Sequence, residues 1–186
     1  MAITYAKNSC LVKTPPQIEI LGRLYTLLQI GNIEIMASDL TGRIGSQGDT
    51  SDCYYRSDLD KWFYYGDSMK SNYLAPYRSA GWRFFESSAM SAIFTALGGN
   101  TAANAQKLLG YFDETWAGNN QTGMNLLPYG ALSNRGASEG YGTQARYIPN
   151  DTYGFNISLN NDGTLNYSES PGAPWFGSIR LYRTIS

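Results

Sequence analysis

Four aspartates in one polar loop are the residues of this sequence best suited to hold a metal ion. Serine, threonine and glycine are common between them, and the four are Asp49, Asp52, Asp58 and Asp60. Calcium takes about six to eight oxygen ligands, which carboxylates and hydroxyls supply. The spacing is not that of an EF-hand loop, and the Glu-Pro-Asn and Trp-Asn-Asp motifs of calcium-dependent lectins are absent. We therefore predict no cofactor, with a structural calcium at these aspartates as the alternative.

Paired acids are the second group that could do chemistry, since two carboxylates at a suitable separation can cleave a glycosidic bond. The candidate pairs are Asp113 with Glu114 and Glu139 with Asp151. All four lie in polar segments, where solvated acids are the ordinary case. The chain contains no histidine, which removes the usual Ser–His and Cys–His nucleophile pairs. The sequence thus predicts a protein that is not an enzyme.

The two cysteines, Cys10 and Cys53, lie far apart and form no C-x-x-C pair. A closed zinc site needs several sulfur or nitrogen ligands, and the chain does not supply them. Two cysteines in a chain of 186 residues do not indicate a disulfide scaffold. We expect free, partly buried thiols, and a disulfide between them is the alternative.

Aromatic side chains are the third candidate, because the chain has 15 tyrosines and 4 tryptophans. Aromatic residues fit the half-buried surface of a β-sheet. Together with Ser, Gly and Asn they also form contact surfaces such as antibody paratopes. Six that fall in predicted loops could stack on sugar rings without a metal: Trp116, Tyr129, Tyr141, Tyr147, Tyr153 and Trp175. Trp175 directly precedes the predicted last strand, so a core position is the alternative there.

Length and composition limit the classes of protein to consider. The 186 residues suit one domain, and an apolar content of 42% is enough to build a core. Charged residues make up only 16%, and the net charge is −1, so the basic stripe of a nucleic-acid binder is absent. No apolar run reaches the roughly 18 residues of a membrane span, which argues against membrane insertion. The N-terminus lacks the pattern of a secretory signal.

The first half of the chain predicts an arm, a hairpin and two helices. Residues 1–20, with Pro15-Pro16, are expected to form the arm, although 18–21 could open an edge strand. Strands over 23–30 and 33–37 are joined by a Gly-Asn turn. A helix over 87–97 has an apolar stripe, a serine cap at Ser87 or Ser88 and a terminating glycine pair. A second short helix is predicted over 101–109.

Outside these elements the pattern is strand and loop. Residues 41–60 and 113–122 are predicted loops, since glycine, serine and aspartate are frequent there. The strand predicted over 154–159 alternates apolar and polar residues, and a turn at 160–163 leads to its return over 164–167. The last strand is placed at 178–182. We expect Trp82 in the core, and Arg180 either packed outward or in a buried ion pair.

Four short sequence motifs, which we call phrases, resemble the Fibrobacter succinogenes major paralogous domain family in their order and spacing along the chain. The resemblance covers roughly residues 20–184. The matching residues are Gly22, Tyr25, Ile30, Gly31, Met36, Ala37 and Leu40; Gly81, Trp82 and Arg83; Thr122, Gly123, Met124, Leu127 and Pro128; and Phe176, Ile179, Arg180, Leu181 and Arg183. Departures include Ile35 for a tryptophan, Asp39 for an asparagine and Met90 for the helix tryptophan. The family's "W-S-S-T" segment is missing.

This resemblance implies a C-type-lectin-like domain of the α+β class, with mixed or antiparallel sheets, two short helices and long loops. The domain would span 21–186 after the arm of 1–20. In such folds the two ends of the chain pair in one sheet beside two helices, and a long loop region over a second sheet binds ligands. The binding face would then come from about residues 113–175. The fold alone does not fix the function.

The expected function is a non-catalytic binding or display module. We expect it in a phage virion as a fibre, decoration or receptor-binding protein that contacts a bacterial surface glycan or protein. The N-terminal arm would join it to other virion proteins or to copies of itself, as a homo-oligomer such as a trimer. The alternatives are a bacterial surface adhesin or glycan-binding module and a purely structural assembly protein.

Overall fold

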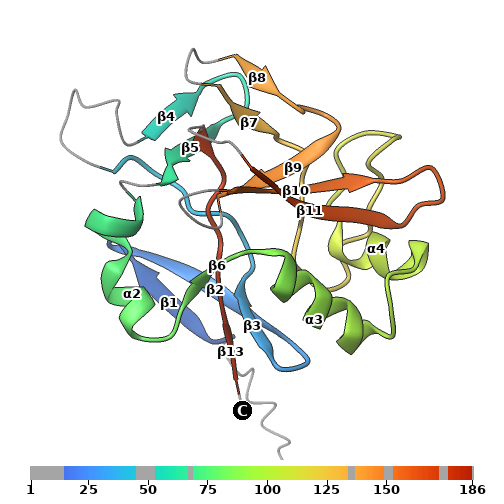
Figure 1. The fold of residues 1–186 in the computed structure, drawn as a ribbon, viewed down its shortest axis with the longest axis horizontal. Coiled ribbons are helices and arrows are strands. Elements are labelled where there is room, and N and C mark those ends of the chain that lie inside the picture. Colours follow the sequence, from blue (N-terminus) through green and yellow to red (C-terminus); the bar gives the residue numbers. More distant parts are fainter. Residues whose placement is uncertain are drawn as a thin grey trace, which may run out of the picture.

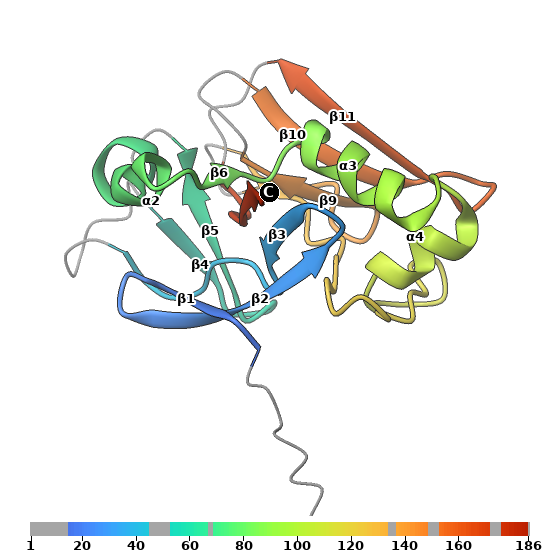
Figure 2. The same cartoon turned by 90° about the horizontal axis from the view of Figure 1, so that it is seen from below.

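Three small sheets and a few short helices build the described part of the chain, which is therefore α+β. The computed structural model describes residues 15–44, 53–66, 69–133, 137–148, 153–171 and 176–185. The named strands pair antiparallel throughout these ranges, and isolated parallel bridges add further links, such as the one from Tyr147 at the end of β9 to Ser178. Figures 1 and 2 show the arrangement.

The first sheet brings the two ends of the described chain together. Its order is β1-β2-β3-β13-β6, and its strands are β1 Gln17–Ile20, β2 Arg23–Ile30, β3 Ile33–Met36, β13 Leu181–Thr184 and β6 Arg83–Phe84. The last strand lies against β3, with Tyr182 opposite Ile35. Residues near position 180 therefore face residues near position 36.

The other two sheets come from the middle of the chain. One has the order β11-β10-β9, from β9 Gln144–Tyr147, β10 Tyr153–Leu159 and β11 Leu165–Pro171. The other has the order β4-β5-β12-β7-β8, from β4 Cys53–Arg56, β5 Lys61–Tyr65, β7 Ala131–Leu132, β8 Ser138–Glu139 and β12 Phe176–Gly177. β4 and β8 are the edge strands of this last sheet.

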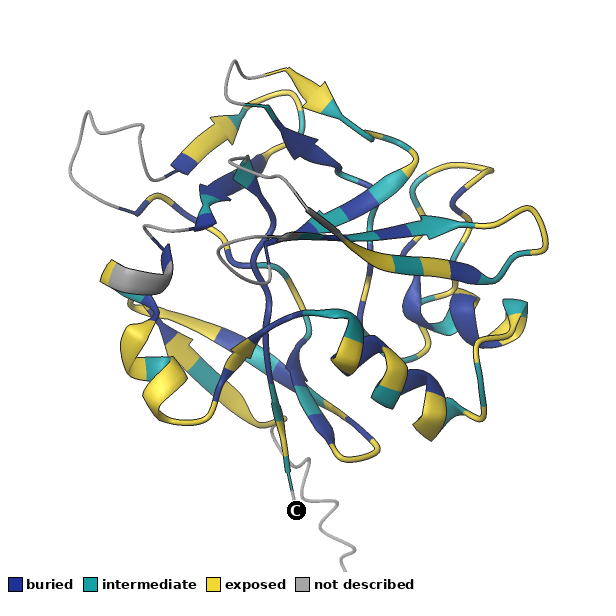
Figure 3. Cartoon of the chain, in the orientation of Figure 1, coloured by how far each residue is buried: buried dark blue, intermediate teal, exposed yellow. Residues whose placement is uncertain are grey.

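The helices are short and follow one another along the chain. They are a π-helical turn Met69–Tyr73, α2 Ala75–Ser79, α3 Ser87–Leu97 and α4 Ala102–Leu108. Figure 2 shows α3 lying beside β11, and Figure 3 shows its alternating buried and exposed surface. Met90, Ile93 and Phe94 form its buried stripe, as the spacing predicts. Among the described residues, no helix is both long and apolar enough to cross a membrane.

Two apolar clusters fill the interior. The first packs α3 and α4 against β10 and β3, and its members include Phe85, Met90, Ile93, Phe155 and Ile157. The second lies between the first sheet and the β4–β5 hairpin, and it includes Ile20, Met36, Tyr64, Trp82 and Leu181. The aromatic rings of Phe85 and Phe155 meet edge to face, with centroids 5.2 Å apart. Trp82 is thus a core residue, as predicted.

The predictions of single strands and helices agree best with the structure. The strand 23–30 and the helix 87–97 are confirmed to the residue. The predicted serine cap is wrong, because Glu86 occupies the N-cap position and makes no side-chain cap bond. Thr101 does cap α4, accepting from Asn104 N at 3.3 Å. Strand β11 is longer than predicted.

Three boundaries need correction. Residues Gln17–Ile20 at the end of the predicted arm form an edge strand paired with β2, one residue earlier than the edge strand predicted over 18–21, and Ile20 is buried; residues 1–14 of the arm lie outside the described part. The predicted loop 41–60 contains β4. The last strand begins at Leu181, three residues later than predicted.

Gly31 is a position where only glycine fits, and its replacement by alanine is expected to destabilise the fold. Its φ is +61°, and an added Cβ would lie 2.6 Å from the Cβ of Ala96 on α3. The positive φ strains the backbone of any residue with a Cβ, and the added Cβ would collide with Ala96. Gly31→Ala should therefore lower the free energy of unfolding by more than about 1 kcal/mol. Urea denaturation measures this change.

Gly22 is the matched control, because it has a φ of +76° in the neighbouring hairpin turn and open space around an added Cβ. Gly22→Ala therefore carries the backbone strain without the collision. An equal loss of stability in the two variants would contradict the role assigned to the contact with Ala96.

Candidate functional site

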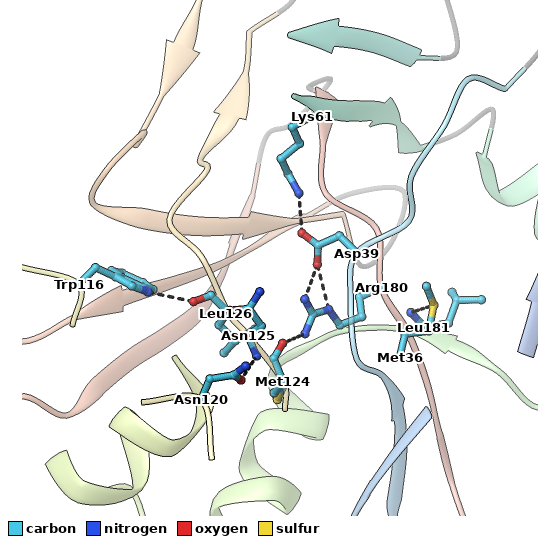
Figure 4. A network of polar contacts seen from close by, with 10 residues as sticks. All are labelled: Met36, Asp39, Lys61, Trp116, Asn120, Met124, Asn125, Leu126, Arg180 and Leu181. Carbon is cyan, nitrogen blue, oxygen red and sulfur yellow. Dashed lines mark hydrogen bonds and ion pairs between the residues drawn. The ribbon is translucent and has the colours of Figure 1, made fainter. Parts of the chain in front are cut away.

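Asp39 binds two basic side chains at the junction of the first sheet and the β4–β5 hairpin. Arg180 donates from Nε and Nη2 to Asp39 Oδ1, at 2.9 and 2.6 Å. Lys61 Nζ donates to the other oxygen, Oδ2, at 2.6 Å. Figure 4 shows the carboxylate between the two basic groups. The predicted buried ion pair of Arg180 is confirmed, since only 2% of this residue is exposed.

These charges stabilise one another because each is largely withdrawn from water. Burial alone would raise the pKa of Asp39, but Lys61 and Arg180 overcome this effect and hold it below the ordinary range of a carboxyl. Asp39 is therefore ionised at neutral pH. Its carboxylate is committed to Lys61 and Arg180, so it is poorly placed to act as a general base.

The Asp39 cluster joins three of the four phrases that carry the family resemblance, and Arg183 links the last of them to the second. Arg180 Nη1 donates to the carbonyl oxygen of Met124 at 2.6 Å, which ties the last phrase to the third. Asp39 lies within the first phrase. The guanidinium of Arg183 lies over the ring of Trp82, 4.7 Å from its centroid, which ties the last phrase to the second. Segments far apart in sequence thus meet through specific side chains.

A hollow of about 180 Å³ lies beside this cluster. Its lining comes from residues 38–41 and 60–62, from Arg180, and from Asn125, Leu127 and Tyr129. Ser38, Asp60 and Asn125 are exposed, while Tyr129 and Trp62 are half-buried. The hollow therefore combines polar groups that face solvent with two aromatic side chains, and small-ligand sites combine apolar and polar groups in this way.

Aromatic side chains continue from the hollow across one face of the β4–β5 hairpin. Tyr54 and Arg56 share this face with Lys61, because cross-strand partners in an antiparallel pair lie on the same side. The ring of Tyr129 lies over Lys61, with Nζ 4.6 Å from its centroid. The ring of Phe112 meets those of Tyr129 and Tyr141 edge to face, at 6.2 and 5.5 Å.

We call the residues Tyr54, Arg56, Phe112, Tyr129 and Tyr141 the aromatic face. A hydrogen bond to Asp58 raises the pKa of the Arg56 guanidinium. Burial raises the pKa of Tyr129, and Asp39, Tyr141 and Asp60 raise it further. The Tyr129 phenol is therefore protonated at neutral pH.

The structure separates the six predicted binding aromatics. Tyr129 and Tyr141 come together on the aromatic face, and Tyr141 is 45% exposed. The predicted exposure of Trp116 and Tyr147 is wrong, since both are buried in the first apolar cluster. Trp116 donates from Nε1 to the carbonyl of Leu126, and Tyr147 lies on β9. Trp175 and the side chain of Tyr153 lie outside the described part.

The predicted acidic sites have structural partners instead. Asp58 pairs with Arg56, and Asp60 Oδ1 accepts from the Tyr55 hydroxyl at 2.7 Å. Within the described residues, no three His, Cys, Asp or Glu side chains gather in a way that could hold a metal ion. Asp49 and Asp52 lie outside these residues.

The carboxylate pairs considered for glycoside cleavage are also engaged. Asp113 Oδ1 accepts from the backbone nitrogens of Thr115 and Trp116, at 2.9 and 2.8 Å. Glu139 pairs with Arg146 at 3.1 Å. Glu114 is exposed, and Asp151 lies outside the described part of the chain.

Cys53 is buried, and its thiol donates to the carbonyl of Ile44 at 3.3 Å. This agrees with the buried thiol expected there. Cys10 lies among the residues that the structure does not describe.

Sequence reasoning missed Asp39, Lys61, Tyr54 and Phe112 as residues of one site. The available signal was the departure from the family phrase at Asp39, where a charge replaces an amide. A carboxylate in an apolar stretch next to a strand calls for a basic partner, because burying an unpaired charge is costly. Arg180, inside an apolar strand pattern, has the same requirement.

No family model matches this sequence, and neither a curated protein nor a solved structure matches it.

Proposed function

We propose that the chain is a non-catalytic binding module of C-type-lectin-like fold, and that its aromatic face contacts a bacterial surface glycan. The observation that carries this proposal is the aromatic face itself. Tyr54 and Tyr141 present 41% and 45% of their surface to solvent beside the half-buried Tyr129. Tyrosine gives a large, rigid contact area at low cost in conformational entropy.

The pairing of the chain ends supports the C-type-lectin-like part of the proposal. β13 lies against β3, and two short helices follow β6 in the chain. The four phrases of the resemblance meet through Asp39, Arg180, Met124, Trp82 and Arg183. A network of this kind gives a physical reason why these phrases would occur together in one fold.

The charge pattern of the site supports binding over catalysis. Each acidic group described near the aromatic face already accepts a hydrogen bond or ion pair from the chain, as Asp39, Asp58 and Asp60 illustrate. A general acid or base needs a free proton-transfer position next to its substrate. Side chains fixed in this manner act instead as a preorganised contact surface, which limits the ordering that a ligand must impose.

A phage particle is the setting we propose, with a bacterial surface as the alternative. The basis is composition: charged residues are only 16% of the chain, while tyrosine, asparagine, serine and glycine are abundant. These four residue types also form adaptable contact surfaces such as antibody paratopes. We propose a homo-oligomer, such as a trimer, for display.

Binding of the labelled chain to whole bacterial cells tests the proposal. We expect binding that is lost when surface polysaccharide is removed from the cells. The double variant Tyr54→Ala/Tyr141→Ala should weaken binding at least about tenfold, because tyrosines at the centre of an interface often account for 2 kcal/mol or more. Binding titrations by flow cytometry measure the change.

Tyr167→Ala provides the control, because Tyr167 is half-buried and stacks on Phe94 of α3 with centroids 5.8 Å apart, away from the aromatic face. This variant should bind like the unmodified chain. No binding by the folded chain, together with an oligomer in which Tyr54 and Tyr141 are protected, would contradict the proposal and favour a structural assembly protein.

A further inference from the structure

We infer that the hollow beside Asp39 binds a single neutral sugar ring, which stacks on Tyr129 and forms hydrogen bonds with Ser38, Asp60 and Asn125. This inference rests on the proposed function and assigns the ligand chemistry of that same site. It requires a hollow of suitable size, a net charge near zero, and polar groups that can exchange hydrogen bonds with hydroxyls.

The size of the hollow fits one ring. Its volume of about 180 Å³ lies below the roughly 300–1,000 Å³ of pockets for drug-sized ligands. One monosaccharide unit can enter, and the rest of a glycan chain would extend over the neighbouring aromatic face. A protein segment would instead need a broad groove to bury several side chains.

The charges that line the hollow favour a neutral ligand. Four charged residues contribute to the lining, two acids and two bases: Asp39, Asp60, Lys61 and Arg180. Their formal charges cancel. Both bases are held by Asp39 at 2.6 Å, so an anionic sugar would have to compete with a carboxylate that is already in place. That competition removes the advantage that a carboxylate or sulfate group would have at a free lysine or arginine.

The polar groups on the rim match sugar hydroxyls. Ser38 offers a hydroxyl and Asn125 an amide, and both residues are exposed. Asp60 uses Oδ1 to accept from Tyr55, and an ionised carboxylate has further acceptor sites on its second oxygen. A sugar ring carries several hydroxyl groups, and each of them both donates and accepts hydrogen bonds. The rim supplies donors as well as acceptors for them.

Tyr129 supplies the aromatic surface, and its position is fixed before a ligand arrives. Lys61 lies against its ring at 4.6 Å and Phe112 meets it edge to face. A side chain held in this way loses little conformational entropy on binding. Burial raises its pKa, so the phenol is a neutral hydrogen-bond donor at neutral pH.

Ligand-observed NMR with the full chain tests the inference, using methyl glycosides of glucose, galactose, mannose and rhamnose as probes. Methyl glucuronide is the matched anion, since it differs from methyl glucoside only by the carboxylate at C6. We expect at least one neutral glycoside to bind and the glucuronide to bind more weakly than the glucoside. Chelation with EDTA should leave binding unchanged, because the proposed contacts need no cation.

Three variants locate the site. Tyr129→Ala should weaken binding at least about tenfold, which corresponds to roughly 1.4 kcal/mol. Tyr129→Phe should retain most of the binding because it keeps the ring, and Tyr167→Ala should bind normally. Thermal melting of each variant verifies that it is folded.

Several results would overturn the inference. They are binding of the glucuronide alone, loss of binding with EDTA, equal losses in Tyr129→Phe and Tyr129→Ala, and the absence of any binding by the neutral probes. If cells still bind the chain when no neutral probe does, the proposed function stands and the sugar assignment falls; protease-sensitive cell binding would then identify a protein receptor. If neutral probes bind the hollow and cells do not bind the chain, the ligand chemistry stands and the cell-surface function falls.

Discussion

Replacing Asp39 by alanine is expected to lower the free energy of unfolding by about 3–5 kcal/mol, the usual cost of removing one partner from a buried ion pair. The loss is large because Arg180 and Lys61 would both remain charged and nearly inaccessible to water, with side chains 2% and 10% exposed. Chemical denaturation of the purified variant measures the change. The three phrases that meet at this cluster, which contain Asp39, Met124 and Arg180, would loosen together.

Two variants separate charge from other effects. Asp39→Asn keeps the size and one acceptor oxygen, so it should cost less than Asp39→Ala. Asp58→Ala removes an aspartate from an ion pair whose carboxyl side chain is 57% exposed, and it should change stability by at most about 1 kcal/mol. Similar losses for Asp39→Ala and Asp58→Ala would show that burial of the Asp39 cluster does not determine its contribution.

The same cluster predicts how stability depends on acid. Because Lys61 and Arg180 hold the folded-state pKa of Asp39 below its ordinary value, this group stabilises the fold fully above the unfolded pKa of about 3.9. The contribution is lost as the pH falls from that value toward the lower folded-state pKa. The stability difference between the unmodified chain and Asp39→Asn should therefore shrink between about pH 5 and pH 2. A difference that stays constant would contradict the lowered pKa.

Elements with a local signal could be predicted from the sequence. The helix α3 has its apolar stripe and a terminating glycine within eleven residues, and Gly98 takes a φ of +89° at its end. The strand β2 and its turn at Gly31 are equally local. In each case the residues that determine the element are also the residues that form it.

The candidate site depends on contacts that no local pattern contains. Asp39 and Arg180 are 141 residues apart and meet only because β13 pairs with β3. Strands of two residues, such as β7 and β12, are too short for a periodic pattern. The β4–β5 hairpin was missed because a Ser- and Asp-rich segment around Cys53 has the composition of a loop. Polar composition therefore concealed the strand that carries Tyr54.

Trp116 illustrates the same difficulty in the opposite direction. The surrounding residues 113–122 are polar and form a loop, which predicts an exposed ring. The loop instead folds back, with Asp113 accepting from the backbone of Trp116 and the backbone nitrogen of Phe112 donating to the Trp116 carbonyl. These bonds satisfy the backbone of the turn and direct the indole inward. A tryptophan in a polar loop can thus anchor that loop.

Trp116→Ala is therefore expected to act on folding rather than on a binding surface, and to lower the free energy of unfolding by about 3–5 kcal/mol. The ring is 1% exposed, and its Nε1 donates to the carbonyl of Leu126 at 3.0 Å. Its removal would leave a cavity in the first apolar cluster and take away one of the two hydrogen bonds to the Leu126 carbonyl, which also accepts from Gly110 N. Thermal and urea denaturation measure the loss.

Trp116→Phe divides this effect into its parts, because it keeps most of the apolar contact and removes the indole donor. It should cost about 0.5–1.5 kcal/mol for the lost hydrogen bond, because the Leu126 carbonyl still accepts from Gly110 N, with a further loss from packing. Cell binding by any folded fraction of Trp116→Ala should match that of the unmodified chain, whereas Tyr54→Ala/Tyr141→Ala should lose binding while remaining folded. A Trp116→Ala variant that melts normally but fails to bind would place this ring in the ligand contact and contradict its burial.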